Sequence, residues 1–534
     1  MKPTSLTQML MVSVATLFIQ CGRADNNFSE SAVTIADNGE SETTSEIIGE
    51  SVEALDVTDS SVEDVDLDLS DVSLDDAVLL EIHTMGETSA GKTIRVGSSS
   101  SGTRSLVSPA ALADEASLAV DVTESFHETL REWESQLDFD DDVSPATSGV
   151  LMAKTQENVG SVRTFQVLNS FSGSSSYEAV EAELVLSRAE FLFYVDERDL
   201  DRFDAEDLAA LADQFESVLP AERALFGSPS DVDGNGKVSV LFTRVVNALS
   251  GSGGGIITGF FYAADLQAAS QNPYSNEGEV IYSFVPDATG ELGTSISKTF
   301  AFSNIYPGVL PHEYQHISNY NRHVLENGGE TEKTFLNEAL SHLAEDIYSL
   351  DDRGFMVEAG LENPSRVASY LNQIDKICFT CGSNLAQRGG SYLFLRYLYE
   401  QAELGNLAGA QSGADLLEAL LSSTAIGIDN LVQGAGGVTA KRRSFVRLMG
   451  TFALAVYYSD FMGINLRGQQ DDNRGTVLNG PAIKTLSEVP SDQVISGSGI
   501  IYLKLSGALI QQVGGHIGLG FNSQPDISGH LIRQ

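Results

Sequence analysis

The sequence is poor in positive charge. Its 534 residues include 31 Lys and Arg against 75 Asp and Glu, so the formal net charge is −44. A chain this acidic has too few cations to displace counterions from a nucleic acid, and we expect no nucleic-acid partner. Between Ala24 and Gly91 there is no Lys or Arg at all. We predict that residues 22–115 form an acidic, Ser-rich, disordered spacer, with a pro-segment or a calcium-buffering tail as the alternatives.

Cysteine is also scarce. The chain has three, Cys21, Cys378 and Cys381. The last two are separated by only two residues, and in an exported protein this spacing favours a local disulfide. A structural zinc site would need further ligands of this kind, and no second cysteine pair exists to supply them.

Long apolar runs are absent. Lys2 precedes a short apolar stretch, Met9–Ile19, that is too short to span a bilayer and is typical of an export signal. We therefore predict an export segment over residues 1–21 and an extracellular or cell-envelope location. Cys21 ends this segment, so a membrane tether through a lipid on Cys21 is one interpretation, and ordinary cleavage near Ala24 is the other.

Apolar periodicity divides the rest of the chain into two parts. Residues 116–460 contain first strand-like and then helix-like segments, and residues 461–534 have the pattern of a small β-rich tail. The expected strands are Val162–Leu168, Ala182–Val195, Val238–Phe242, Ile256–Tyr262 and Glu279–Val285. The expected helices are Ser125–Leu137, Leu208–Leu219, Ser295–Leu325, Thr334–Leu350, Arg388–Ala402, Ala414–Ser422 and Lys441–Tyr458.

A short acidic loop precedes one of these strands. Asp231, Asp233 and Asn235 have the spacing of the first half of a calcium-binding loop. The second half does not match, because the twelfth position is Phe242 where a bidentate Glu is required. The alternatives are therefore a tight turn stabilised by Asp and Asn side chains and a calcium site.

The strongest chemical pattern lies in a predicted helix. The chain has only eight His, yet His312 and His316 stand four residues apart, so both imidazoles can reach one metal ion. Glu313 follows the first His directly and can hold a zinc-bound water. Zinc lowers the pKa of such a water to about 7, and Glu313 can take its proton and pass it to the departing amine.

A catalytic zinc needs a third protein ligand. His323 falls one residue later than an extended His motif requires, so this option is poor. Glu338 lies on the next predicted helix, after a loop containing Gly328 and Gly329 that allows the two helices to run antiparallel. We predict His312, His316 and Glu338 as the metal ligands.

Further polar residues follow these ligands. His342 and Glu345 lie about one and two turns after Glu338 and either orient a ligand or stabilise the oxyanion, or else form an ordinary pair on the helix surface. Candidates for the donor to the transition state are Tyr320, His323, His342 and Tyr392.

The sequence resembles the hyicolysin-type neutral zinc metallopeptidases, within the broad group of glutamate-liganded enzymes that includes thermolysin. The similar segments, besides the His pair, are Leu225–Asp231, Thr258–Tyr262, Ser275–Glu279, Phe335–Asp346 and Tyr392–Leu395. There are two departures. His342 stands where thermolysin-like enzymes have an Asp, and Pro311 is unusual directly before the motif.

The resemblance implies an α+β, zincin-like fold with a mixed β-sheet in the N-terminal lobe and a helical C-terminal lobe. It implies zinc bound by His312, His316 and Glu338, and Glu313 as the catalytic acid and base. The expected protein is a secreted or lipid-tethered zinc endopeptidase, monomeric, acting on proteins or peptides. The alternatives are an inactive adhesion or binding protein on the same scaffold and a zinc hydrolase of non-peptide amides.

Overall fold

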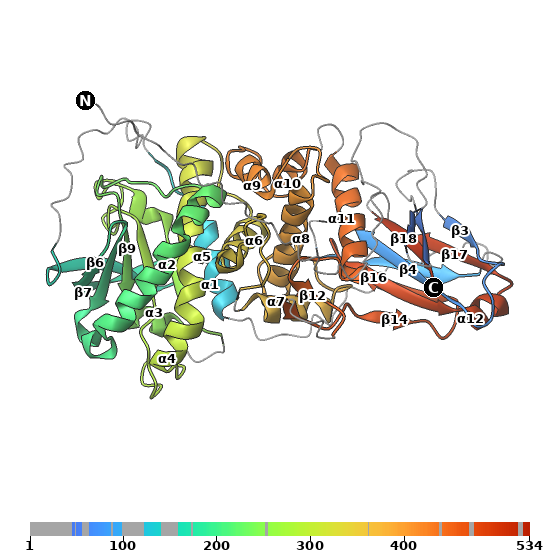
Figure 1. Ribbon diagram of the computed structural model, residues 1–534, viewed down its shortest axis with the longest axis horizontal. Helices are drawn as coiled ribbons and strands as arrows, with labels where there is room; N and C mark the ends of the chain where they lie inside the picture. The colour runs from blue at the N-terminus through green and yellow to red at the C-terminus, as the bar shows by residue number, and fades with distance from the viewer. Residues whose placement is uncertain are drawn as a thin grey trace, which may run out of the picture.

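The computed structural model contains three groups of packed elements, each with its own hydrophobic core. They follow one another from left to right in Figure 1 as a lobe with a mixed sheet, a helical lobe and a β-sandwich. The fold is thus mixed α and β, as the sequence predicts. The structure describes residues 45–47, 50–55, 64–86, 89–98, 122–139, 158–171, 175–250, 255–360, 362–436, 441–468, 475–521 and 527–534.

The first lobe is built on a six-stranded sheet in the order β10-β11-β9-β8-β7-β6. Strands β8, β9 and β11 are parallel to one another, and the other neighbouring pairs are antiparallel. All residues of these three strands are buried, which accounts for their largely apolar sequences. The strands are β6 Val162–Ser170, β7 Ser176–Ser187, β8 Phe191–Asp196, β9 Val238–Phe242, β10 Gly259–Phe261 and β11 Val280–Ser283.

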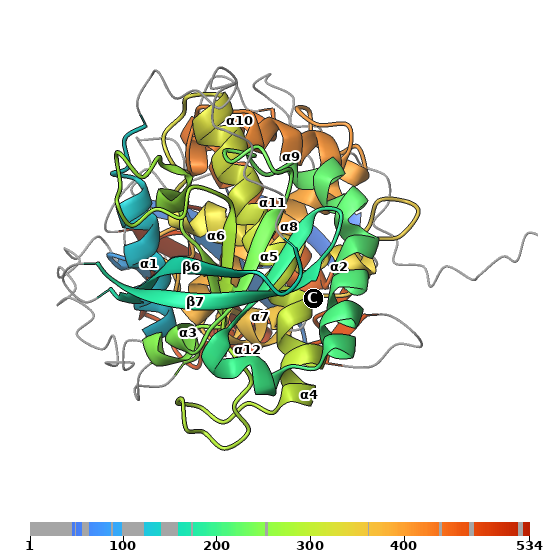
Figure 2. The same ribbon diagram turned by 90° about the vertical axis from the view of Figure 1, so that its left-hand side faces the viewer.

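Helices surround this sheet. Seen along the long axis of the molecule, α1 and α2 lie on opposite sides of the strands (Figure 2). Phe126 and Leu130 of α1 are buried in the core of this lobe, as the apolar spacing of the segment predicts. The helices are α1 Val122–Glu134, α2 Ala205–Phe226, α3 Arg244–Leu249 and α4 Lys298–Phe300.

The helical lobe is arranged around α8, which contacts α6, α7 and α9. Its first helix, α5, also packs on β10 and β11 and so joins this lobe to the sheet. Pro311 lies inside α5, and both candidate ligand histidines follow it in the same helix. The helices are α5 Tyr306–Asn319, α6 Thr334–Ala344, α7 Asn363–Leu371, α8 Leu385–Glu403, α9 Gly413–Leu421, α10 Ile428–Gly434 and α11 Lys441–Tyr458.

The β-sandwich combines both ends of the chain. One sheet has the order β1-β2-β18-β4-β16-β14 and the other β15-β5-β17-β3. A separate two-stranded sheet pairs β12 Ile464–Asn465 with β13 Thr476–Val477. The sandwich strands are β1 Ser45–Ile47, β2 Glu50–Leu55, β3 Asp64–Asp68, β4 Ala77–Thr84, β5 Lys92–Gly97, β14 Ile483–Thr485, β15 Ser491–Ile495, β16 Ile500–Ser506, β17 His516–Phe521 and β18 Ile527–Arg533.

This sandwich corrects two expectations from composition. Residues 22–115 do not form a disordered spacer throughout, because β4 pairs with both β16 and β18 and is buried along almost its whole length. Residues 461–534 do not form a separate tail, because their strands need those of the N-terminal segment as neighbours. The segment is acidic on average, and this composition concealed its short apolar runs. Pairing between strands that are distant in the sequence also leaves no pattern in the local sequence.

Leu80→Ala tests this correction directly. Leu80 is 0% exposed in the sandwich core, and Leu74, in the same acidic segment, is 65% exposed. We expect Leu80→Ala to lower the free energy of unfolding by about 2–5 kcal/mol in urea denaturation, because it leaves a cavity. Leu74→Ala is the control and should change it by less than about 0.5 kcal/mol. Equal effects of the two substitutions would contradict the sandwich.

Two other expectations concern export. Cys378 and Cys381 are joined by a disulfide, as predicted. Among the residues described, no helix has both the length and the apolar character needed to cross a membrane. The predicted export segment and Cys21 lie outside the described residues.

Candidate metal centre

Two imidazoles face one point between the lobes. His312 and His316 lie one turn apart on α5, and both are buried. Their Nε2 atoms are 3.2 Å apart. Two ligands of a tetrahedral metal with bonds of about 2.0 Å lie about 3.3 Å apart, so the spacing suits a shared ion.

The carboxylate of Glu338 completes this group. It projects from α6, and its Oε2 lies 3.8 Å from His312 Nε2 while its Oε1 lies 3.7 Å from His316 Nε2. Both oxygens are buried and have no hydrogen-bond partner among the described residues. Buried polar atoms normally form hydrogen bonds, so two oxygens that form none among the described residues and that face two imidazoles fit a metal ion as the missing partner.

The outer nitrogens of the two imidazoles are fixed by hydrogen bonds. His316 Nδ1 lies 2.8 Å from Asn337 Oδ1, and His312 Nδ1 lies 2.9 Å from Glu345 Oε1. Because a carbonyl or carboxylate oxygen accepts, each Nδ1 carries the proton and donates it. Each Nε2 then presents a lone pair toward Glu338, which is the tautomer a metal ligand needs.

Glu345 links several of these groups. Its Oε1 accepts a second hydrogen bond, from His342 Nδ1 at 2.8 Å, and its Oε2 pairs with Arg366 at 3.0 Å. Burial raises the pKa of Glu345, but the charges of Arg366 and His342 outweigh burial and hold it well below its usual value. An ionised Glu345 therefore orients His312, and the structure places both His342 and Glu345 beside the predicted ligands. The alternative of an exposed surface pair does not hold, since both are buried.

Glu313 lies beside the centre on α5. Its Oε2 accepts a hydrogen bond of 2.9 Å from the backbone N–H of Phe261 in β10. Burial raises the pKa of Glu313 to about 7. A carboxyl group with a pKa near neutrality is suited to take up and release a proton.

Two further side chains reach Glu338 that sequence reasoning did not assign to the site. His127 Nδ1, on α1, lies 3.8 Å from Glu338 Oε1, and Arg388 Nη1, on α8, lies 3.5 Å from Oε2. Arg388 contributes most to keeping the pKa of Glu338 well below normal, against the effect of burial. The only sequence signal for His127 was its place beside Phe126 on the buried face of an amphipathic helix.

Of the remaining predicted residues, Tyr392 and His323 lie away from the ligands and Tyr320 lies near the centre. Tyr392 donates its hydroxyl to Asp346 Oδ2 at 2.6 Å, and is thereby engaged within the helical lobe. The ring of Tyr320 packs against Phe261, near the centre. His323 is buried beyond the end of α5, against the backbone at Gly329. Of the donor candidates, the structure brings only His342 to the ligands.

The acidic loop is organised by its own hydrogen bonds. Gly236 N donates to Asp231 Oδ1 at 2.9 Å, and Asn235 N donates to Asp233 Oδ1 at 3.1 Å. Carboxylates of Asp231, Asp233 and Glu279 lie within 4.8 Å of one another. The turn itself accounts for the Asp and Asn spacing without an ion, so the geometry gives calcium no separate support.

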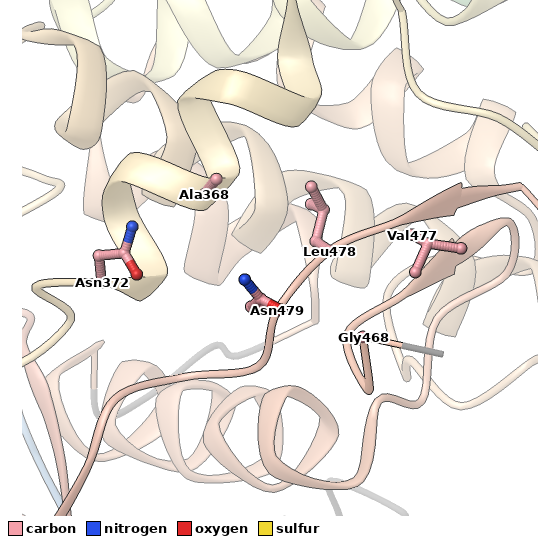
Figure 3. A pocket seen from close by; sticks show the side chains of 6 residues that line it. All are labelled: Ala368, Asn372, Gly468, Val477, Leu478 and Asn479. Carbon is pink, nitrogen blue, oxygen red and sulfur yellow. The ribbon is translucent and has the colours of Figure 1, made fainter. Parts of the chain in front are cut away.

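One small cavity lies at the centre and a larger one lies away from it. The one at the centre has a volume of about 70 Å³ and is bordered by α1, α5 and the loop before β10. A larger one, about 250 Å³, lies near the end of α7 and has only apolar and amide side chains in its lining (Figure 3). It is lined by Ala368, Asn372, Gly468, Val477, Leu478 and Asn479.

Comparison with known proteins identifies a distant relative. Over 202 residues, 37% of this chain, the sequence is 29% identical to the neutral metalloprotease ShpI of Staphylococcus hyicus. The match covers 42% of that protein, so the chain spans less than half the length of the curated relative it matches. No protein-family model matches the chain.

Proposed function

We propose that the protein is an exported, zincin-like endopeptidase that uses zinc to hydrolyse peptide bonds. The observation that carries the proposal is the buried carboxylate of Glu338, which faces His312 and His316 and whose two oxygens find no hydrogen-bond partner in the described part of the chain. The partial similarity to a neutral metalloprotease supports the same class. The nitrogen and carboxylate ligands are those that catalytic zinc sites use.

The chain's own residues would do the proton chemistry. When bound, zinc lowers the pKa of water and polarises a carbonyl group. Glu313, held by the N–H of Phe261, takes the proton from the attacking water. It then returns that proton to the nitrogen of the departing amine. Glu345 and Asn337 keep the two imidazoles in the tautomer that leaves each Nε2 free to bind.

An inactive binding protein on the same scaffold is less well supported. Glu313 is buried beside the carboxylate of Glu338, which raises its pKa further. A protein that only binds would gain nothing from keeping two acids so close. The non-peptide amide alternative has no observation of its own in its favour.

Removal of the metal tests the proposal. We expect the purified full-length chain to carry about one zinc per chain by plasma mass spectrometry. Treatment with 1,10-phenanthroline should abolish cleavage of a broad fluorogenic peptide library, and one equivalent of zinc should restore it. The thermal midpoint should rise with zinc, since a ligand that binds only the folded state stabilises it.

Magnesium at the same concentration is the control and should restore nothing. Cleavage by metal-free protein would contradict the zinc mechanism. Folded, zinc-loaded protein that cleaves no peptide would instead favour the inactive scaffold.

A further inference from the structure

Helix α1 packs where the sheet lobe meets the helical lobe. In Figure 1 it stands between the sheet lobe and α6. Its buried face reaches both the metal centre and the edge of the sheet. The buried residues of this face are Phe126, His127, Leu130, Arg131 and Glu134.

Two side chains of α1 cover the free edge of the sheet. Within the described strands, β10 is the last of its sheet and pairs only with β11. Arg131 Nη2 donates to Phe261 O at 3.0 Å, and Glu134 Oε1 accepts from Ala263 N at 2.9 Å. Arg131 and Glu134 also pair with each other at 2.9 Å.

These contacts take up the groups with which an extended peptide would pair. In an antiparallel pair the N–H and C=O of one residue point to the same side. Both groups of Phe261 bond to side chains, Glu313 and Arg131, so they face away from β11. A strand edge of this kind binds a peptide by adding it to the sheet. Helix α1 thus occupies the Phe261 carbonyl and the N–H of Ala263 just after β10, while Glu313 of α5 holds the Phe261 N–H.

His127 reaches the metal centre from the same helix. Its Nδ1 is buried, lies 3.8 Å from Glu338 Oε1 and has no hydrogen-bond partner in the ranges that the structure describes. The two predicted imidazole ligands stand at 3.7 and 3.8 Å from the same carboxylate. A catalytic zinc with three protein ligands keeps a fourth position for water or substrate. His342 Nε2, also buried and without a hydrogen-bond partner among the described residues, lies 3.9 Å from Glu338 Oε2 but comes from α6 itself, whereas His127 reaches this carboxylate from outside α5 and α6.

A purely structural role does not account for this arrangement. Leaving a buried nitrogen unpartnered costs about 1–3 kcal/mol, and an apolar residue at position 127 would avoid that cost. The cavity that remains, about 70 Å³, is far below the roughly 300 Å³ or more of a ligand cleft. On its other side α1 is held by Glu128, which accepts from Ser383 N at 3.1 Å, so it contacts both lobes.

We propose that α1 is an internal inhibitor of this protein: it fills the substrate cleft along β10, and His127 takes the open coordination position of the metal. The proposal rests on the function proposed above and adds its regulation. Substrate gains access only when α1 leaves the cleft. The measured activity and ligand affinity of the intact chain are then proportional to the fraction of molecules in which the cleft is open.

The test uses full-length, metal-loaded protein and His127→Ala. We expect kcat/KM for a fluorogenic peptide to rise at least about 10-fold, because apparent affinity scales with the open fraction. Affinity for acetohydroxamate, measured by calorimetry in a Glu313→Gln background that does not turn over, should rise by a similar factor. In the cobalt-substituted protein the visible spectrum should change, since an imidazole is exchanged for water.

Glu132→Ala, on the exposed side of α1, is the matched control and should change none of the three. If His127→Ala does not fold, as judged by circular dichroism, His127→Gln and Arg131→Gln take its place. Equal hydroxamate affinity and an unchanged cobalt spectrum in a folded variant would overturn the inhibitor while leaving the peptidase intact. Failure of the wild-type chain and every variant to bind zinc would overturn both.

Discussion

Glu313→Gln is expected to lower kcat/KM for peptide cleavage by about 100- to 10,000-fold, the range that a general base contributes. Gln keeps the length of the side chain, and its carbonyl can still accept the N–H of Phe261 that Glu313 accepts now. It cannot take a proton from water. Zinc content should therefore stay at about one ion per chain, and the loss should appear in kcat.

Glu330→Gln is the control for this substitution. Glu330 is exposed in the loop between α5 and α6. Replacing it with Gln therefore removes the same charge near the same helices without changing the metal centre. Activity within about twofold of wild type is expected from it. A Glu313→Gln protein that holds zinc and still cleaves at the wild-type rate would remove Glu313 from the mechanism, and another acid would have to be sought.

The local part of the site could be predicted from sequence because helix geometry determines it. Residues four apart on a helix share a face, so the spacing of the His pair alone places both imidazoles together. Glu338 needed one more step, the antiparallel return of α6 after a Gly-containing loop. The structure brings its carboxylate to within 3.8 Å of both imidazoles.

The long-range part could not be predicted in this way. His127 lies on α1, far before Glu338 in the sequence, and Arg388 lies on α8, well after it. Only tertiary packing brings both side chains to Glu338. The spacing of apolar residues in α1 indicates which face is buried. It does not indicate what lies opposite, so a histidine on that face has the pattern of an ordinary core residue.

The β-sandwich was missed for a related reason. Strand β4 has eight residues, and its neighbours are strands from the other end of the chain. Its apolar residues divide between two cores: Leu80 faces the interior of the sandwich, and Leu79 packs with the helical lobe. Composition averaged over a long acidic segment does not reveal strands such as β4, whose pairing partners lie far away in the sequence.

The sandwich also bears on how α1 is retained. Strands β2–β5 precede α1 and are paired with C-terminal strands that follow the helical lobe. The chain on the N-terminal side of α1 is thus fixed to the rest of the molecule by sheet hydrogen bonds. Cleavage of the chain before α1 would leave the helix connected to the sheet lobe, and cleavage after α1 would leave it connected to the sandwich.

Glu338→Gln is expected to weaken zinc binding by more than about 100-fold, because loss of a ligand should exceed the 10- to 100-fold effect of losing a group that only supports one. The same change should also lower the stability of the metal-free protein. Burial opposes the charge of Glu338, but Arg388 and the neighbouring imidazoles hold its pKa well below normal, so the ionised carboxylate is favoured there, and a neutral amide would leave the buried Arg388 without its counter-charge.

The two effects give Glu338→Gln an unusual stability pattern that calorimetry can check. Zinc should raise the thermal midpoint of the wild type and leave that of the variant unchanged at the same concentration. The metal-free midpoint should be lower in the variant, because Arg388, which stands 3.5 Å away, loses its counter-charge. A variant whose midpoint rises with zinc as much as that of the wild type would remove Glu338 from the ligands and leave it only as the partner of Arg388. Equal metal-free midpoints would contradict a stabilising pair of charges.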